Sequence, residues 1–281
     1  MNNTFNIKRF GLVMRKDFQE NWKRYTVQFL AMFGVIVLVM FATFFSMKNS
    51  DFDSKYINSD LLLRNCLIFL GFGWVFASTC TAPMRSKIKR ASYLMLPASS
   101  LEKYVLRWLI VTVGYIIAFL VALFLADVLR VAFFSIYFSD VHLLDFGKLI
   151  GTGITTIGYD YVFYTISEFY LFIGVFFLFQ SICILGSTFW EKASFVKTFA
   201  TLTIAGFLFF TTAYWAISLF YNDIYHYSEI LESIPIRTGL SDDEMGFITA
   251  FVMIGICVFL TLVNWVFTFF RFRESEIIKR L

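Results

Sequence analysis

The sequence predicts an all-α membrane protein with six transmembrane helices, and its composition and the length of its apolar runs carry this prediction. Apolar residues make up 59% of the 281 residues, charged residues make up 16%, and the mean hydropathy is +0.72. Soluble domains do not have this balance. Six runs reach the roughly 20 apolar residues that a helix needs to cross the hydrocarbon core of a bilayer. The predicted spans are 27–47, 65–83, 105–126, 164–187, 198–220 and 247–270.

Helices are favoured over a β-barrel because the six runs are apolar on every face. Inside the hydrocarbon core the backbone N–H and C=O groups must form hydrogen bonds with one another, which a helix does within its own segment. The strands of a β-barrel would instead alternate between apolar and polar residues. The domain organisation that follows is an N-terminal arm (1–26), a six-helix transmembrane domain (27–270) and a tail (271–281).

The N-terminal arm is predicted to be an amphipathic helix that lies in the membrane interface. Phe10, Met14, Phe18 and Trp22 recur every four residues, which places them on one stripe of an α-helix, while most of the cations fall off the stripe. A helix of this kind buries its apolar face at the headgroup boundary. A simple topological anchor is the alternative.

The charge pattern predicts that both termini are cytoplasmic. Most Lys and Arg residues outside the spans lie in the arm, in the 85–104 loop, between spans four and five, and in the tail. With six spans these four segments share one membrane face, and an excess of cations marks the cytoplasmic face. Anionic lipid headgroups account for the net charge of +4, so membrane lipids rather than nucleic acid are the expected partners.

The 85–104 loop, RSKIKRASYLMLPASSLEKY, is predicted to project a short basic helix with an apolar tip. Pro97 disfavours helix at its own position and at the residue before it. Ser99 and Glu102 form a capping box from which span three begins. The tip either re-enters the headgroups or fills a groove on a partner protein, and we favour the partner. The candidate interface residues are Arg85, Lys87, Ile88, Lys89, Arg90, Tyr93, Leu94, Met95, Leu96 and Pro97.

Two further local patterns help to define the ends of the spans. Ser241 and Glu244 form a second capping box, which predicts where the helix of span six begins. Asp127 and Arg130 interrupt a long apolar run at positions i and i+3, where the two side chains can form an ion pair on one helix face. We place the outer boundary of span three at this pair.

Polar residues at membrane depth are the candidates for a functional role inside the spans. Glu168, Gln180 and Asn264 are the main ones. Such residues either line a functional path or make ordinary interhelical hydrogen bonds and interfacial contacts, and both interpretations stay open.

The sequence does not indicate an enzyme. Its two histidines, His142 and His226, lie in separate outer loops, and neither a metal-binding spacing nor a nucleophile motif is present. We therefore expect no catalytic residue, no metal and no cofactor in this chain. The four cysteines fall within predicted spans and are expected to be small packing residues.

The segment YLMLPASSLEKY resembles a pattern of the ABC-2 type permeases, the membrane-spanning subunits of a class of ABC transporters. In that pattern a Leu-Pro-Ala-Ser turn precedes a Glu-Lys pair at the head of span three. The topology and the amphipathic arm are similar as well. The resemblance implies a multi-pass protein of the bacterial inner membrane, with a second permease subunit, in a homodimer or a heterodimer, and a cytoplasmic ABC ATPase subunit. It also implies that 85–97 is the coupling loop and favours export.

Two alternatives from other classes remain. A membrane scaffold would use the basic loop to recruit a cytoplasmic protein or lipid without transporting anything. An ion- or proton-driven carrier would need several ionisable groups near the middle of the membrane, which this sequence does not supply.

Overall fold

The structure is a computed structural model of the chain. The structure describes residues 5–49, 54–84, 93, 95–137, 142–150, 161–163, 165–190, 192–220 and 242–278. These residues form helices, and among them Ile150 and Phe163 make an isolated parallel β-bridge but no strand. The all-α class is therefore confirmed for the described part of the chain.

The helices follow the apolar runs of the sequence. They are α1 (Ile7–Asn49), α2 (Ser54–Ala77), the 3-10 turn η1 (Ala82–Met84), α4 (Ser100–Leu109), the π-helical turn η2 (Ile110–Gly114), α5 (Tyr115–Phe134), the 3-10 turn η3 (Phe146–Leu149), α6 (Ile166–Phe189), α7 (Ser194–Phe220) and α9 (Asp242–Ile278). Six stretches in the described residues are long and apolar enough to cross a membrane, with α4, η2 and α5 forming one of them. Six spans of this kind are typical of a multi-pass integral membrane protein.

The ends of several helices differ from the sequence prediction. α1 is one continuous helix, so the arm does not end before the first span. α2 ends at Ala77 and is followed by turns, whereas the second span was expected to run to residue 83. α9 continues without a break past residue 270, so its last turns include most of the predicted tail. In α1 and α9, helix propensity and intrahelical hydrogen bonding extend the helix beyond its apolar core.

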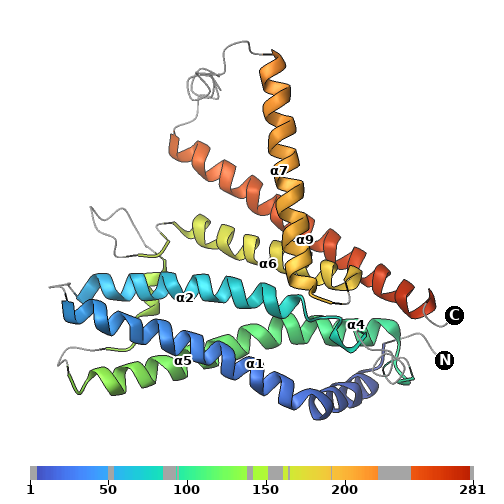
Figure 1. Cartoon of the computed structure of the whole chain (residues 1–281), viewed down its shortest axis with the longest axis horizontal. Coiled ribbons are helices and arrows are strands. Elements are labelled where there is room, and N and C mark those ends of the chain that lie inside the picture. Colours follow the sequence, from blue (N-terminus) through green and yellow to red (C-terminus); the bar gives the residue numbers. More distant parts are fainter. Residues whose placement is uncertain are drawn as a thin grey trace.

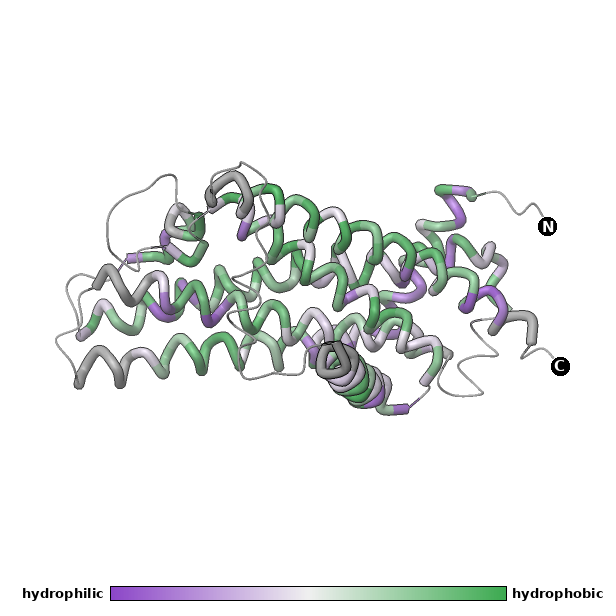
Figure 2. Tube along the Cα trace, turned by 90° about the horizontal axis from the view of Figure 1, so that it is seen from above, coloured by the Kyte–Doolittle hydropathy of each residue, from purple (hydrophilic) through white to green (hydrophobic). Residues whose placement is uncertain are grey.

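The helices α1, α2, α4–α5 and α6 run side by side along the long axis of the molecule (Figure 1). α9 crosses this layer obliquely and packs mainly on α6. The start of α1 and the end of α9 lie at the same end of the bundle, close to α4. Hydrophilic residues gather at this end, whereas the middle of the helices is mostly hydrophobic (Figure 2). We call it the terminal end of the bundle.

The core of the bundle lies where α1, α2, α5 and α6 meet. Tyr115 and Phe176 are 1% exposed, and the rings of Phe69 and Phe176 stack with their centroids 4.4 Å apart. The hydroxyl of Tyr115 donates a 2.6 Å hydrogen bond to the carbonyl oxygen of Phe69, which satisfies its polar atom inside the apolar core. Gly73 allows this close packing, because a Cβ at that position would lie 2.5 Å from a ring carbon of Phe176.

α7 leaves the bundle. Its first turns pack on α6, where Gly186 faces Thr198, and the rest of the helix points away across the long axis of the molecule (Figure 1). Only 6% of the most apolar 18-residue stretch of α7 is buried inside the molecule, the smallest share among the six candidate spans. Its large exposed side chains, Phe207 and Phe210 among them, therefore need lipid or another protein surface to shield them from water.

The third span changes helix type along its length. α4 passes into the π-helical turn η2, in which the amide of Tyr115 donates to the carbonyl oxygen of Ile110, and then into α5. The helix does not stop at Asp127, where we placed the outer boundary of this span, but continues to Phe134.

Candidate functional site: the junction of the N-terminal arm with α4

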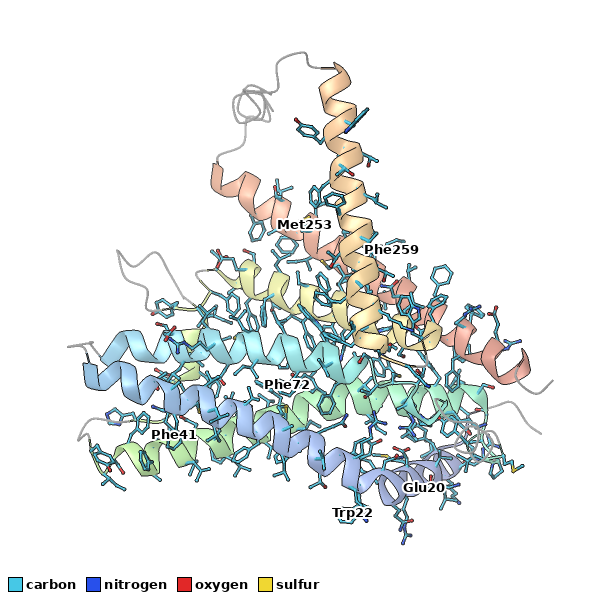
Figure 3. All side chains as sticks on the ribbon, in the orientation of Figure 1. Glu20, Trp22, Phe41, Phe72, Met253 and Phe259 are labelled. Atoms are coloured by element: carbon cyan, nitrogen blue, oxygen red, sulfur yellow. The ribbon has the colours of Figure 1, made fainter. Side chains whose placement is uncertain are left out.

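The candidate site lies at the terminal end of the bundle, where the start of α1 meets the turn before α4 and the first two turns of α4. We call the part of α1 from Ile7 to Tyr25 the arm, and its contacts with residues 93–107 the arm junction. The arm bends relative to the rest of α1 close to Glu20 and Trp22 (Figure 3). This bend places one face of the arm along α4.

The predicted capping box at the start of α4 is confirmed. Ser99 has an extended backbone, with φ −70° and ψ 154°, and its hydroxyl accepts a 3.2 Å hydrogen bond from the amide of Glu102. The Glu102 carboxylate in turn accepts a 2.9 Å hydrogen bond from the amide of Ser99. Pro97 lies in a turn, in which the amide of Ala98 donates to the carbonyl oxygen of Leu96. The proline and the capping box together fix the point where span three begins.

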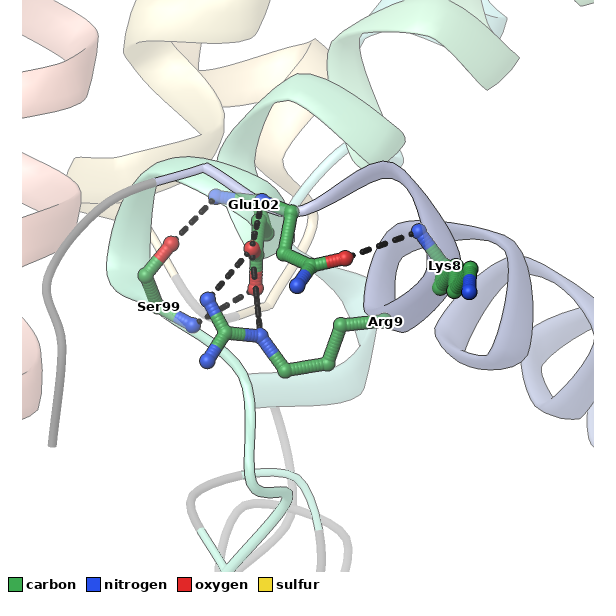
Figure 4. Close-up of polar contacts among 5 residues, drawn as sticks. Lys8, Arg9, Ser99 and Glu102 are labelled. Carbon is green, nitrogen blue, oxygen red and sulfur yellow. Dashed lines mark hydrogen bonds and ion pairs between the residues drawn. The ribbon is translucent and has the colours of Figure 1, made fainter.

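Glu102 also binds the arm, a contact that the sequence did not reveal (Figure 4). Arg9 contacts both of its carboxylate oxygens, with Nη2 at 2.7 Å from Oε1 and Nε at 3.1 Å from Oε2. The amide of Asn6 donates to Oε1 at 2.8 Å. The Glu102 side chain is fully buried, so its charge is stabilised by this two-point contact and by the backbone donors.

A second buried ion pair lies further along the arm, between Asp17 of α1 and Arg107 of α4. The Asp17 side chain is 6% exposed and that of Arg107 is 7% exposed. Tyr25 donates a 2.6 Å hydrogen bond to Oδ2 of Asp17, and Asn21 donates a 2.9 Å hydrogen bond to Oδ1. Arg107 also donates to the hydroxyl of Tyr25. The carboxylate of Asp17 is therefore hydrogen-bonded through both of its oxygens, as a buried charge requires.

Tyr93 joins the loop to this network, and for this residue the prediction of an exposed tip is wrong. Tyr93 is 7% exposed, packs in a cluster with Tyr104 and Phe272, and donates to the carbonyl oxygen of Lys103 at 3.2 Å. Its ring lies under the cations of Lys103 and Arg107, at 5.7 and 5.6 Å. Burial raises the pKa of its hydroxyl to about 12, although Arg107 opposes the rise. A tyrosine suits this position because its ring can pack against apolar side chains while it also contacts cations and its hydroxyl makes a hydrogen bond.

Met95 is the described residue that fits the predicted tip, because it is 82% exposed. Leu96 is half-buried, and Pro97 is exposed. The other candidate interface residues, Arg85, Lys87, Ile88, Lys89, Arg90 and Leu94, lie outside the residues that the structure describes.

The apolar stripe of the arm is only partly used in the fold. Phe10 and Met14 are half-buried, Phe18 is 45% exposed, and Trp22 is 57% exposed and extends away from the bundle (Figure 3). The residues most buried against α4 are Val13 and Asp17, one helical turn apart. The face of the arm that packs is therefore rotated from the predicted stripe, and the exposed aromatic residues stay available for a membrane interface.

A cavity of about 250 Å³ lies beside the Asp17–Arg107 pair. The arm lines it with Lys16, Glu20, Asn21 and Arg24, and Arg107 lines it from α4. The rest of its wall comes from η1 and from the turn before α4. Cationic side chains thus meet at a hollow between three segments that are distant in sequence.

The intramembrane polar candidates serve different purposes. Gln180 of α6 is 0% exposed and donates a 3.1 Å hydrogen bond to the carbonyl oxygen of Val111, within the π turn η2. Asn264 of α9 donates to the hydroxyl of Ser181 at 3.0 Å, so it joins α9 to α6. Both contacts fit the interpretation as interhelical hydrogen bonds. Glu168 is exposed in the first turn of α6, which fits an interfacial position.

Two sequence features remain, the Asp127–Arg130 pair and the second predicted capping box. Asp127 and Arg130 form the predicted i, i+3 ion pair at 2.7 Å, but both are buried, and they also bind the backbone of Leu144 and His142. Ser241 lies outside the described residues, as does the side chain of Glu244, although α9 does begin at residue 242.

No protein-family model matches this chain, and neither a curated protein nor a solved structure matches it. The function must therefore be argued from the residues of the chain and from the geometry described above.

Proposed function

We propose that this chain is the permease subunit of an ATP-driven transporter of the ABC-2 type. In this proposal it is a multi-pass protein of a bacterial inner membrane, it pairs with a second permease subunit, and it exports its substrate. A separate ATPase chain supplies the energy and contacts segment 85–97. The motif-level resemblance of 85–104 to those permeases motivates the proposal.

The observation that carries the proposal is the double attachment of the start of α4 to the arm. Arg9 binds Glu102 in the first turn of α4, and Asp17 binds Arg107 in the second. The two acidic–basic pairs run in opposite directions, since the arm supplies the cation in one and the anion in the other. Because both pairs are largely buried, separating the arm from α4 would leave uncompensated charges, which is strongly unfavourable.

A push on the loop would therefore move two transmembrane helices together. The turn that holds Pro97 leads directly into span three, and the arm leads directly into span one without a break in the helix. Rigid-body motion of packed helices is a common way to switch access across a membrane. In this proposal the arm junction transmits motion from the loop to the first and third spans, and the partner chain hydrolyses ATP.

Co-purification tests the proposal directly. The chain, tagged and expressed at native level, is extracted in a mild detergent and its partners are identified by mass spectrometry. A stoichiometric cytoplasmic ATPase that carries a nucleotide-binding motif is the expected result. A preparation that lacks any ATPase chain would count decisively against the proposal.

Met95 offers a sharper test of the coupling loop. Met95→Ser in the reconstituted complex removes the exposed apolar contact and should abolish the stimulation of ATPase activity by the permease, with the chain still folded. Leu12→Ser is the matched control, because Leu12 is 67% exposed at the same end of the bundle but lies on the arm rather than on the turn. Equal loss in both variants would argue against a specific role for the turn.

A further inference from the structure

We infer that Phe272, in the last turns of α9, is a positioning residue for the turn before α4, and that it carries movement of this turn to α9 and α6. The part of the inference that concerns movement rests on the proposed transport function. The packing of Phe272 with the buried Tyr93 is a property of the chain alone. Residue 272 belongs to the segment that was predicted to be a tail, so its role goes beyond that of a simple chain end.

Tyr93, Tyr104 and Phe272 form one buried cluster at the terminal end of the bundle, which we call the aromatic cluster. Phe272 is 3% exposed and Tyr93 is 7% exposed, although both lie in segments rich in charged residues. Leu96 packs against the cluster from the turn, and Phe269 packs against it from α9. Because protein interiors are close-packed, a cluster that draws side chains from three segments fixes the positions of these segments relative to one another.

The contacts between α9 and α4 hold Phe272 in a defined place. The hydroxyl of Tyr104 donates a 2.9 Å hydrogen bond to the carbonyl oxygen of Trp265. The ring centroids of Phe269 and Phe272 lie 5.5 and 6.0 Å from that of Tyr104. Trp108, one turn further along α4, meets Trp265 edge-on with the centroids 5.0 Å apart. Aromatic pairs at these separations stabilise a contact beyond the area that they bury.

Tyr93 links the aromatic cluster to the turn. On one side, its hydroxyl donates to the carbonyl oxygen of Lys103, and its ring lies near the cations of Lys103 and Arg107. Phe272 adds an apolar contact from α9. A smaller side chain at position 272 would leave space beside Tyr93, into which its ring could move. The turn that follows Tyr93 would then lose its fixed position.

α9 connects the aromatic cluster to the second half of the molecule. It packs mainly on α6, and Asn264 donates to the hydroxyl of Ser181 across this contact. Gly174 allows a close approach of the two helices, because a Cβ at that position would lie 3.3 Å from the Cβ of Cys257. Packed helices of this kind move as rigid bodies. Movement of the turn therefore reaches α9 and α6 through Phe272, in addition to the spans that the two ion pairs join.

Hydrogen exchange of the purified full-length chain in detergent, read by mass spectrometry, tests the positioning role. Phe272→Ala should make the amides of residues 95–99 exchange at least about tenfold faster, because the turn loses its packed support. The amides of Leu96 and Ala98 report on this turn, since each donates to a carbonyl oxygen within 93–96. Phe270→Ala is the matched control, because Phe270 lies two residues away and is 52% exposed. It should change the rate by no more than about twofold, and equal acceleration in both variants would overturn the inference.

Two further variants separate positioning from a general loss of stability. Phe272→Leu keeps an apolar side chain in the aromatic cluster, so it should restore most of the protection and leave an acceleration of about threefold. This variant takes the place of Phe272→Ala if the latter does not fold. Tyr93→Ala/Phe272→Ala should exchange no faster than the faster of its two single variants, because both act through the same contact. Additive effects, or equal acceleration in α2, which has no residue in the cluster, would contradict the positioning role.

The movement is tested in the reconstituted complex with its ATPase chain. Phe272→Ala should retain that chain but lower the stimulation of its ATPase activity by at least about fivefold, whereas Phe270→Ala keeps the stimulation. Faster exchange with unchanged stimulation would overturn the role of Phe272 in movement. Absence of any ATPase chain would instead contradict the proposed function, and the exchange rates alone would then decide the positioning role.

Discussion

Asp17 of α1 and Arg107 of α4 form an ion pair between residues 90 positions apart in the sequence, and the two side chains are 6% and 7% exposed. The pair joins the first and third spans at the terminal end of the bundle. Neither charge can be solvated by water when its partner is missing. The contribution of the pair to the free energy of unfolding is therefore best measured by replacing one of the two side chains at a time.

Arg107→Met should lower the free energy of unfolding by about 3–5 kcal/mol, since it leaves Asp17 as an uncompensated buried charge. Asp17→Asn/Arg107→Met should cost less than Arg107→Met alone. The measurement is unfolding by a denaturing detergent, followed by circular dichroism. Asp60 and Arg64 supply the control, because they form an ion pair at 2.7 Å with side chains 48% and 41% exposed. Breaking that pair should cost less than about 1 kcal/mol, and an equal cost at both pairs would contradict the role of burial.

Arg9→Ala should release the start of the arm from α4. The variant loses the two-point contact with Glu102, so the amides of residues 7–13 should exchange with deuterium about 10 to 100 times faster, as expected for the loss of one or two charge-assisted bonds. Hydrogen exchange read by mass spectrometry gives the rate for this segment. Lys8→Ala removes a neighbouring cation whose side chain is exposed, and it should change the rate by no more than about twofold. Similar acceleration in both variants would show that general charge, not the contact, holds the arm.

Gly73→Ala and Gly71→Ala should have opposite effects although they lie two residues apart on α2. A Cβ at Gly73 would meet Phe176 at 2.5 Å and Tyr115 at 3.0 Å, and overpacking of this kind costs about 1–3 kcal/mol. A Cβ at Gly71 meets nothing within 4 Å, so the higher helix propensity of alanine should stabilise the chain by up to about 1 kcal/mol. Thermal unfolding of the two variants in detergent measures the difference. Destabilisation by both would mean that α2 packs differently from the structure.

Tyr93 should make the stability of the chain sensitive to alkaline pH. Its pKa is raised by burial from 10.0 to about 12, so the unfolded chain loses the phenolic proton first as the pH rises. Stability contributed by this group is therefore present below pH 10 and falls between about pH 10 and 12, by an amount on the order of 2 kcal/mol. Tyr93→Phe removes this fall, so the wild type should lose stability relative to the variant between pH 9 and 11.5. A constant difference across that range would contradict the buried, neutral hydroxyl.

The composition of the chain predicted its helices well, because long apolar runs allow few other structures in a membrane. The capping box at Ser99 and the pair formed by Asp127 and Arg130 were also predicted, since both depend on residues within one turn of each other. Interactions between residues so close in the sequence can be predicted without knowing the fold.

The arm junction could not be predicted, because its contacts join positions about 90 residues apart. The position of Arg107 inside an apolar run could have indicated that it needs an acidic partner, but the sequence analysis did not use it, and several carboxylates could have served as that partner. Tyr93 was misjudged because an aromatic residue in a basic loop fits an exposed tip as well as a buried one. Its burial depends on Phe272 at the far end of the chain, which folding brings against α4.

The π-helical turn η2 sets the rotational phase between the two halves of the third span. Because each residue advances an α-helix by about 100°, a turn that accommodates one extra residue rotates everything after it by roughly that angle. Deleting a residue between Ile110 and Gly114 would therefore swing Tyr115 out of the core while Arg107 kept its place, or the reverse. The wider turn between Arg107 and Tyr115 therefore lets the first half of the helix face Asp17 of the arm while the second half faces the core.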